Sequence, residues 1–387
     1  IKQIFSMYKN LVDFTKKLYK NSENLPLHEP FFDNDEKKYL EDVIDSTFVS
    51  SVGKAIKIFE DEIKKFTSSK YAVATVNGTS ALHTALKISG VSINDEVITQ
   101  SLTFVATSNA ITYCGAIPNF LDVDKDTLSL SPICLKEFLS SHCEMRKDGF
   151  CWNKLTNRRI KSCIVMHTFG LAGRVHELRE ICDLYNIILI EDAAESLGTF
   201  IGKTHTGTIA DIGIMSFNGN KIITTGGGGM ILTQKKDLGE KFRHITTTAK
   251  VNHEWHFDHD EIGFNYRMPN LNAALGVAQM KKLKTFLATK RNIASSYQKW
   301  GKDNSIEFVR EIDGTTSNYW LNALLAENIR ERDDILEITN KNGVMTRPAW
   351  KPMHQLKINQ KFETFVPLVN TDWLFERIVC MPSSFSK

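Results

Sequence analysis

Hydrophobic residues follow two spacings along this chain, one typical of helices and one typical of buried strands. Ile56, Phe59 and Ile63 recur at steps of three and four, which predicts a helix with one apolar face. Short apolar runs such as residues 187–190 predict buried strands. The predicted helices are 35–44, 54–66, 79–88, 104–113, 135–139 and 177–185, and the predicted strands are 71–76, 96–99, 119–123, 163–167, 187–190 and 212–217. This alternation predicts a largely parallel sheet covered by helices on both faces.

Three regions depart from the alternation. The first 20 residues carry apolar side chains at roughly helical spacing, which predicts an amphipathic helix that packs as an arm rather than contacting a membrane. The polar and aromatic region 142–159 is predicted to be an insertion loop. After residue 270 the pattern changes to long helical stretches and mixed segments, which predicts a second, smaller domain. The predicted divisions are a helical arm at 1–27, a large cofactor-binding domain at 28–260 and a smaller C-terminal domain at 261–387.

Composition limits the class of protein. The 387 residues are 42% hydrophobic and 24% charged, as in ordinary globular proteins and unlike disordered or fibrous chains. A net charge of +3 is too small for a general polyanion binder, so nucleic acid is not an expected partner. The sequence contains no apolar run long enough to cross a bilayer, and its first residues do not resemble a signal peptide. Seven scattered cysteines without a close pair favour a reducing cytoplasm.

The most informative polar residues follow two of the apolar strands. Asp192 lies at the end of one strand, and Lys221 lies in a polar turn after another, shortly before the glycine run 226–229. Because open α/β sheets present ligand-binding groups at the carboxyl ends of their strands, Asp192 and Lys221 are predicted to meet there. An amine that forms a Schiff base and a carboxylate that keeps a pyridine nitrogen protonated are what pyridoxal phosphate chemistry requires. Taken alone, the aspartate is more often a helix cap and the lysine more often solvated, so the inference depends on their combination.

Several motifs, in this order, resemble those of one enzyme family. They are 48–53 (FVSSVG), 77–83 (NGTSALH), 102–110 (LTFVATSNA), 191–195 (EDAAE), 216–221 (SFNGNK), 263–268 (GFNYRM) and 381–384 (MPSS). The chain resembles the DegT/DnrJ/EryC1/StrS family of pyridoxal-phosphate-dependent nucleotide-sugar aminotransferases over about residues 25–384. The resemblance implies the aspartate aminotransferase type I fold, an α/β fold with a large, mixed and mostly parallel sheet plus a smaller C-terminal α+β domain. The opening 25–30 and the glycine run more narrowly resemble a LegC-like branch, associated with legionaminic acid and related bacterial sugars.

The resemblance assigns roles around the cofactor ring. Lys221 would be the Schiff-base lysine and then the general base and acid that moves the proton. Asp192 would pair with the pyridinium nitrogen, and Phe104 would stack on the ring unless it is an ordinary core residue. Glu195 occupies the position near the phenolic oxygen of the cofactor where relatives often carry Gln or His.

The cofactor phosphate needs several hydrogen-bond donors. The residues that match this role are Gly78, Thr79, Ser80, Ser216 and Asn218. The turn 77–80 joins a strand to a helix, and such a turn presents N–H groups and hydroxyls to an anion. Asn265 matches a residue that the family supplies from the neighbouring subunit, which implies a homodimer with shared active sites.

Further side chains are candidates for binding the sugar nucleotide. They are His28, Ser51, Tyr319, Arg347 and His354. Three histidines at positions 253, 256 and 259 have a spacing that suits metal ligands on a helix. Because their surroundings predict a polar loop and the chemistry needs no metal, no metal site is predicted.

These inferences define an expected reaction. L-Glutamate donates its amino group to pyridoxal 5′-phosphate, and a nucleotide-linked 4-keto-6-deoxy sugar then receives it at C4, with ping-pong kinetics. The expected acceptor is UDP-2-acetamido-2,6-dideoxy-4-keto-hexose, used in lipopolysaccharide or capsule biosynthesis. The alternatives are a 3-keto sugar aminotransferase, a sugar dehydratase of the same fold and a non-catalytic regulator. Lys221 argues against a dehydratase, because relatives of that type carry His at this position.

Overall fold

A computed structural model of the chain describes residues 2–21 and 23–386, with side chains from residue 7 onward in those ranges. Its largest sheet has nine strands. They are β1 (Tyr71–Thr75), β2 (Glu96–Gln100), β3 (Ile117–Leu121), β4 (Cys143–Met145), β5 (Cys151–Asn153), β6 (Arg158–Met166), β7 (Ile188–Asp192), β10 (Ile212–Ser216) and β11 (Gly229–Thr233). The order is β1-β11-β10-β7-β6-β2-β3, and the pairs from β10 to β3 are parallel. The predicted mixed, mostly parallel sheet is therefore confirmed.

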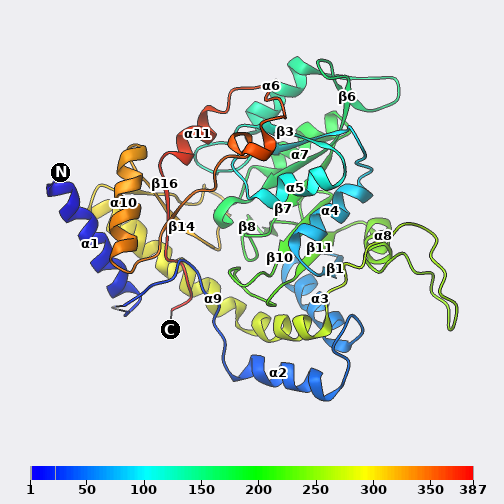
Figure 1. The fold of residues 1–387 in the computed structure, drawn as a ribbon, viewed down its shortest axis with the longest axis horizontal. Coiled ribbons are helices and arrows are strands. Elements are labelled where there is room, and N and C mark those ends of the chain that lie inside the picture. Colours follow the sequence, from blue (N-terminus) through cyan, green and yellow to red (C-terminus); the bar gives the residue numbers. More distant parts are fainter. Residues whose placement is uncertain (1, 22, 387) are drawn as a thin grey trace.

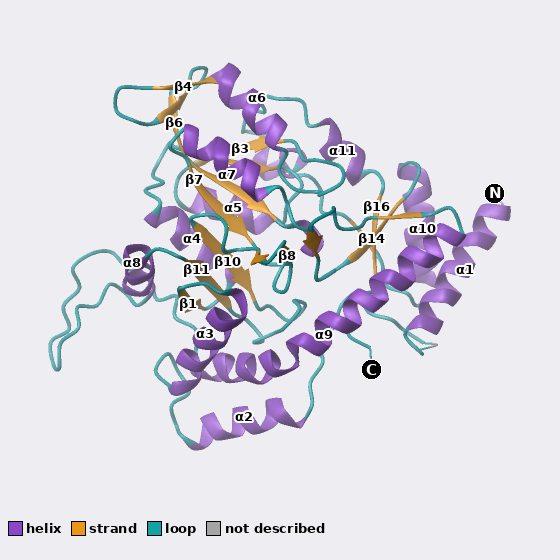
Figure 2. Cartoon of the chain, turned by 180° about the vertical axis from the view of Figure 1, so that it is seen from behind, coloured by secondary structure: helices purple, strands orange, loops and turns teal. Residues whose placement is uncertain are grey.

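Helices cover both faces of this sheet, as Figures 1 and 2 show. They are α3 (Lys54–Thr67), α4 (Gly78–Ile88), α5 (Val105–Tyr113), α6 (Pro132–His142), α7 (Val175–Leu184), α8 (Lys236–Thr246) and α9 (Asn270–Asp303). Helix α2 (Asn34–Asp45) lies outside this layer and packs against α9. Neighbouring residues of β7 belong to different clusters of the core, because alternate strand residues point to opposite faces. Leu189 packs in a cluster with Leu178 of α7, whereas Ile190 packs in a cluster with Leu82 of α4.

A smaller antiparallel sheet lies at the other end of α9. It has the order β12-β14-β16-β15. The remaining elements are α1 (Lys2–Leu18), β8 (Phe200–Ile201), β9 (Thr204–His205), β12 (Glu307–Phe308), β13 (Thr315–Thr316), β14 (Asn322–Leu325), α10 (Ile329–Lys341), β15 (Arg347–Pro348), α11 (Val369–Phe375) and β16 (Ile378–Met381), with 3-10 turns at Thr168–Gly170, Met353–Gln355 and Lys357–Asn359. A third sheet, β13-β8-β9, joins residues on both sides of position 260. The predicted division between residues 260 and 261 stays a prediction, and this sheet crosses it.

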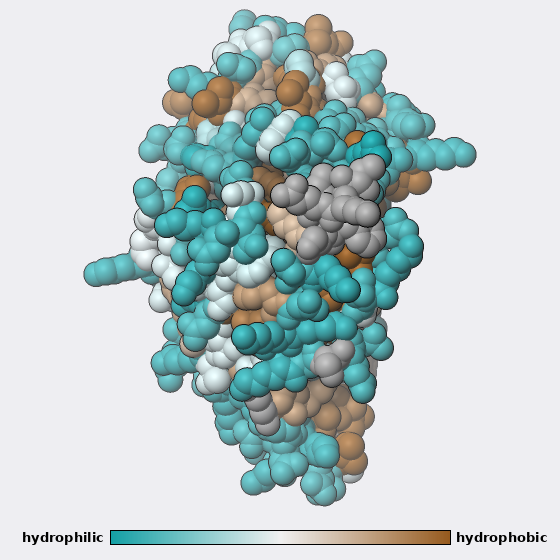
Figure 3. Space-filling model, turned by 90° about the vertical axis from the view of Figure 1, so that its left-hand side faces the viewer, coloured by the Kyte–Doolittle hydropathy of each residue, from teal (hydrophilic) through white to brown (hydrophobic). Residues whose placement is uncertain are grey.

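Helix α1 packs against the smaller sheet and α10. Its side chains Tyr8, Leu11 and Val12 are buried in one cluster with Tyr297 of α9 and Ile335 of α10. Figure 3 shows that hydrophilic side chains cover most of the face at this end of the molecule. The apolar face of α1 is thus covered by protein, as the packing interpretation expects. Residues 1 and 22 of the predicted arm 1–27, and residue 387 of the predicted C-terminal domain, lie outside the described residues. Within 2–21 and 23–386, no helix is long and apolar enough to cross a membrane.

The predicted insertion loop at 142–159 is wrong, because β4 and β5 form an antiparallel hairpin that joins the main sheet through β6. Polar residues of this region donate hydrogen bonds to a buried carboxylate. Glu96, which is 1% exposed, accepts hydrogen bonds from Asn119, Asn153 and Thr156. A polar pattern predicts solvent exposure only when no buried polar partner exists, and the sequence does not reveal that partner.

Several predicted boundaries also shift. Strand β3 spans Ile117–Leu121 rather than 119–123, and β6 begins at Arg158 rather than 163. Helix α6 runs from Pro132 to His142 and is capped by Ser131, so it is longer than the predicted 135–139. These shifts leave the order of the elements unchanged.

Candidate active site

The carboxyl ends of β7 and β10, the start of α4 and two tryptophans from beyond α9 enclose one cavity of about 350 Å³. Its wall includes eight of the residues predicted to bind the cofactor or to act on the substrate: Gly78, Thr79, Phe104, Asp192, Glu195, Ser216, Asn218 and Lys221. The structure therefore brings together side chains that lie up to 143 positions apart, from 78 to 221.

Asp192 is the last residue of β7 and is 6% exposed. Thr107 Oγ1 donates a hydrogen bond to Asp192 Oδ2 at 2.9 Å, and the N–H of Ala194 donates to Oδ1 at 3.3 Å. Burial raises the pKa of Asp192, and these hydrogen bonds only partly oppose that shift. A cationic ring nitrogen placed against the carboxylate would favour its ionised form.

Glu191, the neighbour of Asp192, points to the other side of the sheet and joins β7 to the chain that leads into β10. Its fully buried carboxylate accepts the N–H groups of Gly207, Ile209 and Ala210 and lies 3.1 Å from Nε2 of His167. The N–H of Gly173 donates to Nδ1 of His167, so Nε2 carries the proton that faces Glu191. Burial raises the pKa of Glu191, but the hydrogen bonds from His167 and the backbone outweigh burial and leave that pKa below its usual value.

Lys221 lies across the cavity from Asp192 and forms an ion pair. Its Nζ is 3.1 Å from Oε1 of Glu195, whose Oε2 accepts the N–H of Phe169 at 3.0 Å. Nζ also lies 4.1 Å from the centre of the Trp320 ring, within cation–π distance. Burial raises the pKa of Glu195 to about 7, against the opposing charge of Lys221. Glu195 can therefore take up or release a proton near neutral pH.

The start of α4 forms an anion-binding end of the cavity. Asn77 caps the helix by accepting the N–H of Ser80 at 2.7 Å. Ser80 is not on the cavity wall, and its role at the cofactor phosphate stays a prediction. A Cβ on Gly78 would lie 3.0 Å from Cβ of Ser216, so glycine allows the end of β10 to approach the helix closely. Gly78, Thr79 and Ser216 thus meet at a helix N-terminus, which favours a phosphate group.

Aromatic side chains form the opposite walls. Phe104 is 47% exposed and faces the cavity, which distinguishes it from a core phenylalanine. Its ring centre lies 6.1 Å from that of Trp350, which in turn packs 5.2 Å from Phe169. Trp320 and Trp350 are wall residues that the sequence analysis missed. Neither belongs to a periodic pattern or a spaced motif, so the sequence contains no local signal for them.

Four candidates for binding the sugar nucleotide lie away from the cavity wall. The hydroxyl of Tyr319 accepts hydrogen bonds from Gln298 and from the N–H of Glu311. Nδ1 of His354 lies 2.7 Å from Oγ of Ser101, and Arg347 is exposed on β15. Ser51 is half-buried just before α3.

His28 and Asn265 also lie outside the cavity wall. His28 lies behind Trp320, with its ring nitrogen Nε2 3.0 Å from Nζ of Lys290. Asn265 is exposed and forms a β-bridge with Thr247, so it is not on the cavity wall of its own chain. The geometry of one chain therefore leaves Asn265 available to a second molecule.

The three histidines weighed as metal ligands are His253, His256 and His259, and each is engaged within its own loop. Nδ1 of His253 accepts the N–H groups of Trp255 and His256. Nδ1 of His259 donates to the carbonyl oxygen of Thr248 at 2.8 Å. These contacts order the loop locally.

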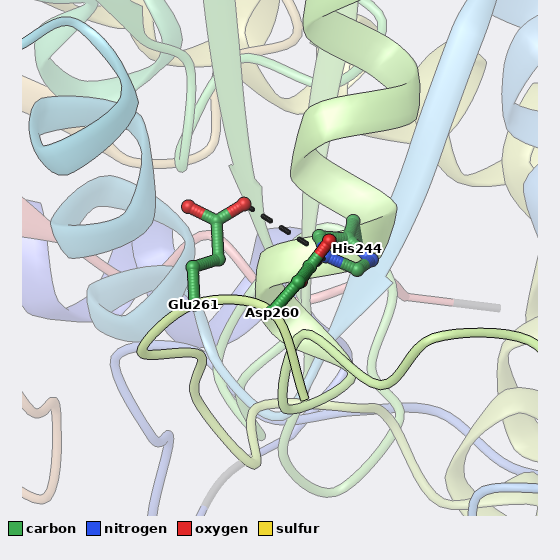
Figure 4. A group of neighbouring side chains, drawn as sticks. All are labelled: His244, Asp260 and Glu261. Atoms are coloured by element: carbon green, nitrogen blue, oxygen red, sulfur yellow. Dashed lines mark hydrogen bonds and ion pairs between the residues drawn. The ribbon is translucent and has the colours of Figure 1, made fainter. Parts of the chain in front are cut away.

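A different group of possible ligands lies where this loop returns to α8. Figure 4 shows His244 against Asp260 and Glu261. Nε2 of His244 is 2.6 Å from Oδ1 of Asp260, and Nζ of Lys241 forms an ion pair with Glu261. These contacts tie the end of the loop to α8.

We expect Glu195→Gln to change how stability depends on pH. In the unfolded chain Glu195 ionises near pH 4.5, whereas the folded protein holds the proton to about pH 7. The stability that this group contributes is therefore complete at low pH and is lost as the pH rises through 7. Between pH 5 and pH 8 the free energy of unfolding of the wild type should therefore fall by about 2 kcal/mol relative to that of Glu195→Gln, because glutamine does not titrate. Urea unfolding of the cofactor-free proteins measures this, with the exposed Glu254→Gln as control. Parallel pH curves for Glu195→Gln and the wild type would contradict the assignment.

Comparison with known proteins agrees with this geometry. The sequence profile of the DegT/DnrJ/EryC1/StrS aminotransferase family matches residues 30–386. The chain is 34% identical over 351 residues to GDP-perosamine synthase of Vibrio cholerae, which covers 90% of this chain and 91% of that protein. It is also 34% identical over 375 residues to the putative pyridoxal phosphate-dependent aminotransferase EpsN of Bacillus subtilis (strain 168), covering 95% of this chain and 91% of that protein.

The fold is shared with solved aminotransferases. Helicobacter pylori PseC, an aminotransferase of pseudaminic acid biosynthesis, aligns with a TM-score of 0.84 at 23% identity, over 93% of this chain and 94% of that chain. The resemblance seen in the sequence is thus confirmed at the level of the family, its cofactor and its type I fold. The chain belongs to the DegT/DnrJ/EryC1/StrS family and is a sugar aminotransferase that uses pyridoxal 5′-phosphate.

Proposed function

We propose that this aminotransferase moves the amino group of L-glutamate to C4 of a nucleotide-linked 4-keto-6-deoxy sugar, for bacterial surface polysaccharides. The observation that carries the proposal is the single cavity that joins Lys221, Asp192 and the start of α4. It offers an amine, a carboxylate and an anion-binding helix end to one ligand.

The residues on the cavity wall fit pyridoxal 5′-phosphate. Gly78, Thr79 and Ser216 would hold its phosphate, Asp192 would face its ring nitrogen and Phe104 would lie against its ring. When bound, the cofactor supplies an electron sink for the bond that breaks at the substrate carbon.

Lys221 and Glu195 would handle the proton of this reaction. The base at the substrate carbon would be the amine of Lys221, whose Nζ lies 3.1 Å from the carboxylate of Glu195. Because burial raises the pKa of Glu195 to about 7, this carboxylate can take up or release a proton near neutral pH beside that amine. Trp320 and Trp350 form part of the wall of the site.

The acceptor should be a ketone, because an amine condenses only with a carbonyl group. A linked nucleotide would supply remote binding energy, which enzymes use to orient the reacting carbon. UDP-2-acetamido-2,6-dideoxy-4-keto-hexose remains the first candidate, as expected for a LegC-like branch. A GDP-linked keto sugar is the second candidate, because relatives named GDP-perosamine synthase are 34% identical to this chain. Placement in the cytoplasm, where nucleotide sugars are made, stays part of this proposal.

We also propose that the enzyme is a homodimer with shared active sites. The loop that precedes Asn265 projects from the body beside α8, as Figures 1 and 2 show. It exposes Trp255, Phe257 and Ile262 at 67%, 77% and 90%. Exposed apolar side chains on a projecting loop favour contact with another protein surface. A second copy of the chain would bring Asn265 to the partner's cavity.

Replacing Lys221 tests the chemistry. Lys221→Ala should lose the visible absorbance of the bound cofactor and slow the conversion of L-glutamate to 2-oxoglutarate by more than about 10³-fold, because it removes both the amine and the base. Single-turnover spectroscopy with L-glutamate alone measures this half-reaction. Lys284→Ala, at an exposed position of α9, is the control. Formation of 2-oxoglutarate at the wild-type rate by Lys221→Ala would refute the assignment.

A panel of acceptors tests the substrate. UDP-, GDP- and dTDP-linked 4-keto-6-deoxy sugars are offered with L-glutamate, and NMR locates the new amine. We expect amination at C4, with kcat/KM about tenfold higher for the UDP-2-acetamido sugar than for the others. A preference for the GDP-linked sugar would select the second candidate. Turnover of only a 3-keto or a non-sugar acceptor would refute both.

Mixed dimers test the shared site. Lys221→Ala and Asn265→Ala should each be inactive as homodimers. When unfolded together and refolded, their mixture should recover about a quarter of the wild-type activity, because half of the dimers then hold one intact site. Activity is measured per chain against refolded wild type. No recovery, with mixed dimers present by native mass spectrometry, would show that Asn265 serves its own chain.

A further inference from the structure

Lys290, in the middle of α9, is a buried cation next to the active site. It is 2% exposed, and its Nζ lies 3.0 Å from Nε2 of His28 and 3.2 Å from the carbonyl oxygen of Trp320. Nζ also donates to the carbonyl oxygen of Ser383. One ammonium group therefore joins three segments that are far apart in the sequence.

The partners of Lys290 are neutral acceptors, so its charge is expensive to bury. Burial lowers the pKa of Lys290 to about 7, which reflects that penalty. The titratable groups that face it are His28 and, beyond it, Lys221, and burial followed by both charges holds the pKa of His28 well below its usual value. A methionine would fill the same space without this penalty. What lysine adds is three directed hydrogen bonds.

One of these hydrogen bonds fixes the backbone of the residue that covers Lys221. The ring of Trp320 lies 4.1 Å from Nζ of Lys221, and its Nε1 donates to the carbonyl oxygen of Asn220 at 2.6 Å. The N–H of Trp320 donates to Oδ1 of Asn318 at 2.8 Å. Lys290 binds the carbonyl oxygen of Trp320. The N–H, the carbonyl oxygen and the ring nitrogen of Trp320 are therefore all hydrogen-bonded.

The turn that carries Trp320 needs such support, because it is strained. Tyr319 has φ of 48°, in the left-handed region that a bulky residue rarely adopts. Asn318 Nδ2 donates to the carbonyl oxygens of Glu195 and Leu197, which ties the turn to the cavity. The next residue of α9, Arg291, donates to the carbonyl oxygen of Ser317 at 2.9 Å. Helix α9 thus binds both ends of this turn.

We propose that Lys290 is a positioning residue of the active site, which holds Trp320 over Lys221 and so sets the orientation in which the lysine amine meets the cofactor. This inference rests on the proposed role of Lys221. It assigns to a residue outside the cavity a function that acts through the tryptophan ring. Loss of the ammonium group should therefore affect Lys221 only when that ring is present.

The test follows the capture of pyridoxal 5′-phosphate by the cofactor-free protein. In this step the amine of Lys221 and the aldehyde of the cofactor form a carbon–nitrogen double bond and release one water. The rise of visible absorbance gives the rate, and borohydride reduction with mass spectrometry confirms the site. The variants are Lys290→Met, Trp320→Leu, the double variant and, as control, Lys284→Met at an exposed position of α9.

We expect Lys290→Met to slow capture about tenfold, the effect of losing one hydrogen bond from a charged donor, while Lys284→Met leaves the rate unchanged. Adding Lys290→Met to Trp320→Leu should slow capture no further, because the two residues act in series. The ratio of wild-type to Lys290→Met rates should also fall from pH 6 to pH 9, as Lys290 loses its proton. An unchanged rate in Lys290→Met, or additive effects in the double variant, would overturn the proposal.

Should Lys290→Met fail to fold by circular dichroism, the ratio of wild-type to Trp320→Leu rates is followed over the same pH range. A fall with pH supports the proposal, and a constant ratio overturns it. Failure of glutamate or sugar turnover in the wild type would refute the proposed function and not this inference, because capture of the cofactor needs no substrate.

Discussion

The pairing of β7 with β10 is the constraint on which the active site depends. Parallel pairing brings Asp192 to the same edge of the sheet as Ser216, and the turn after Ser216 carries Lys221 to the cavity. Glu191 supports this arrangement from the opposite face, because its carboxylate binds the N–H groups of Gly207, Ile209 and Ala210, which lead into β10. Glu191 and Asp192, the last two residues of β7, thus have different roles. One carboxylate aligns the strands, and the other faces the ligand.

The sequence predicts the elements better than it predicts the distant walls of the site. Strands and helices such as 71–76 and 54–66 form in order, because their apolar spacing is set by local geometry. Residues at strand ends, such as Asp192, follow from the architecture of open α/β sheets. Trp320 and Trp350 could not be predicted, since the chain returns to the cavity only after α9 and nothing in the local pattern records that return. Likewise, the hairpin β4–β5 is held by Glu96, which lies 57 positions before Asn153 and 60 before Thr156.

Two buried carboxylates, Asp192 and Glu195, carry the acidic charge of the cavity wall. Asp192 and Glu195 are both buried, and burial raises the pKa of each. Only Glu195 has a lysine within 3.1 Å, and only Asp192 has a hydroxyl donor from α5. The two carboxylates therefore differ in their partners rather than in their exposure. Lys290 adds a cation behind the wall, and its partners there are two carbonyl oxygens and a ring nitrogen of His28.

Helix α9 extends over 34 residues, which corresponds to about 50 Å of continuous helix. Near its start, Asn270 binds the backbone at Phe48 and Ala55, while farther along Lys290 and Arg291 bind the turn at Ser317 and Trp320. Long helices curve gently, and α9 changes direction along its length, as Figures 1 and 2 show. Any rotation of the small sheet relative to the large one must therefore either carry the cavity roof with it or bend α9. In the first case the segment around Phe48 would move together with Trp320, because α9 binds both.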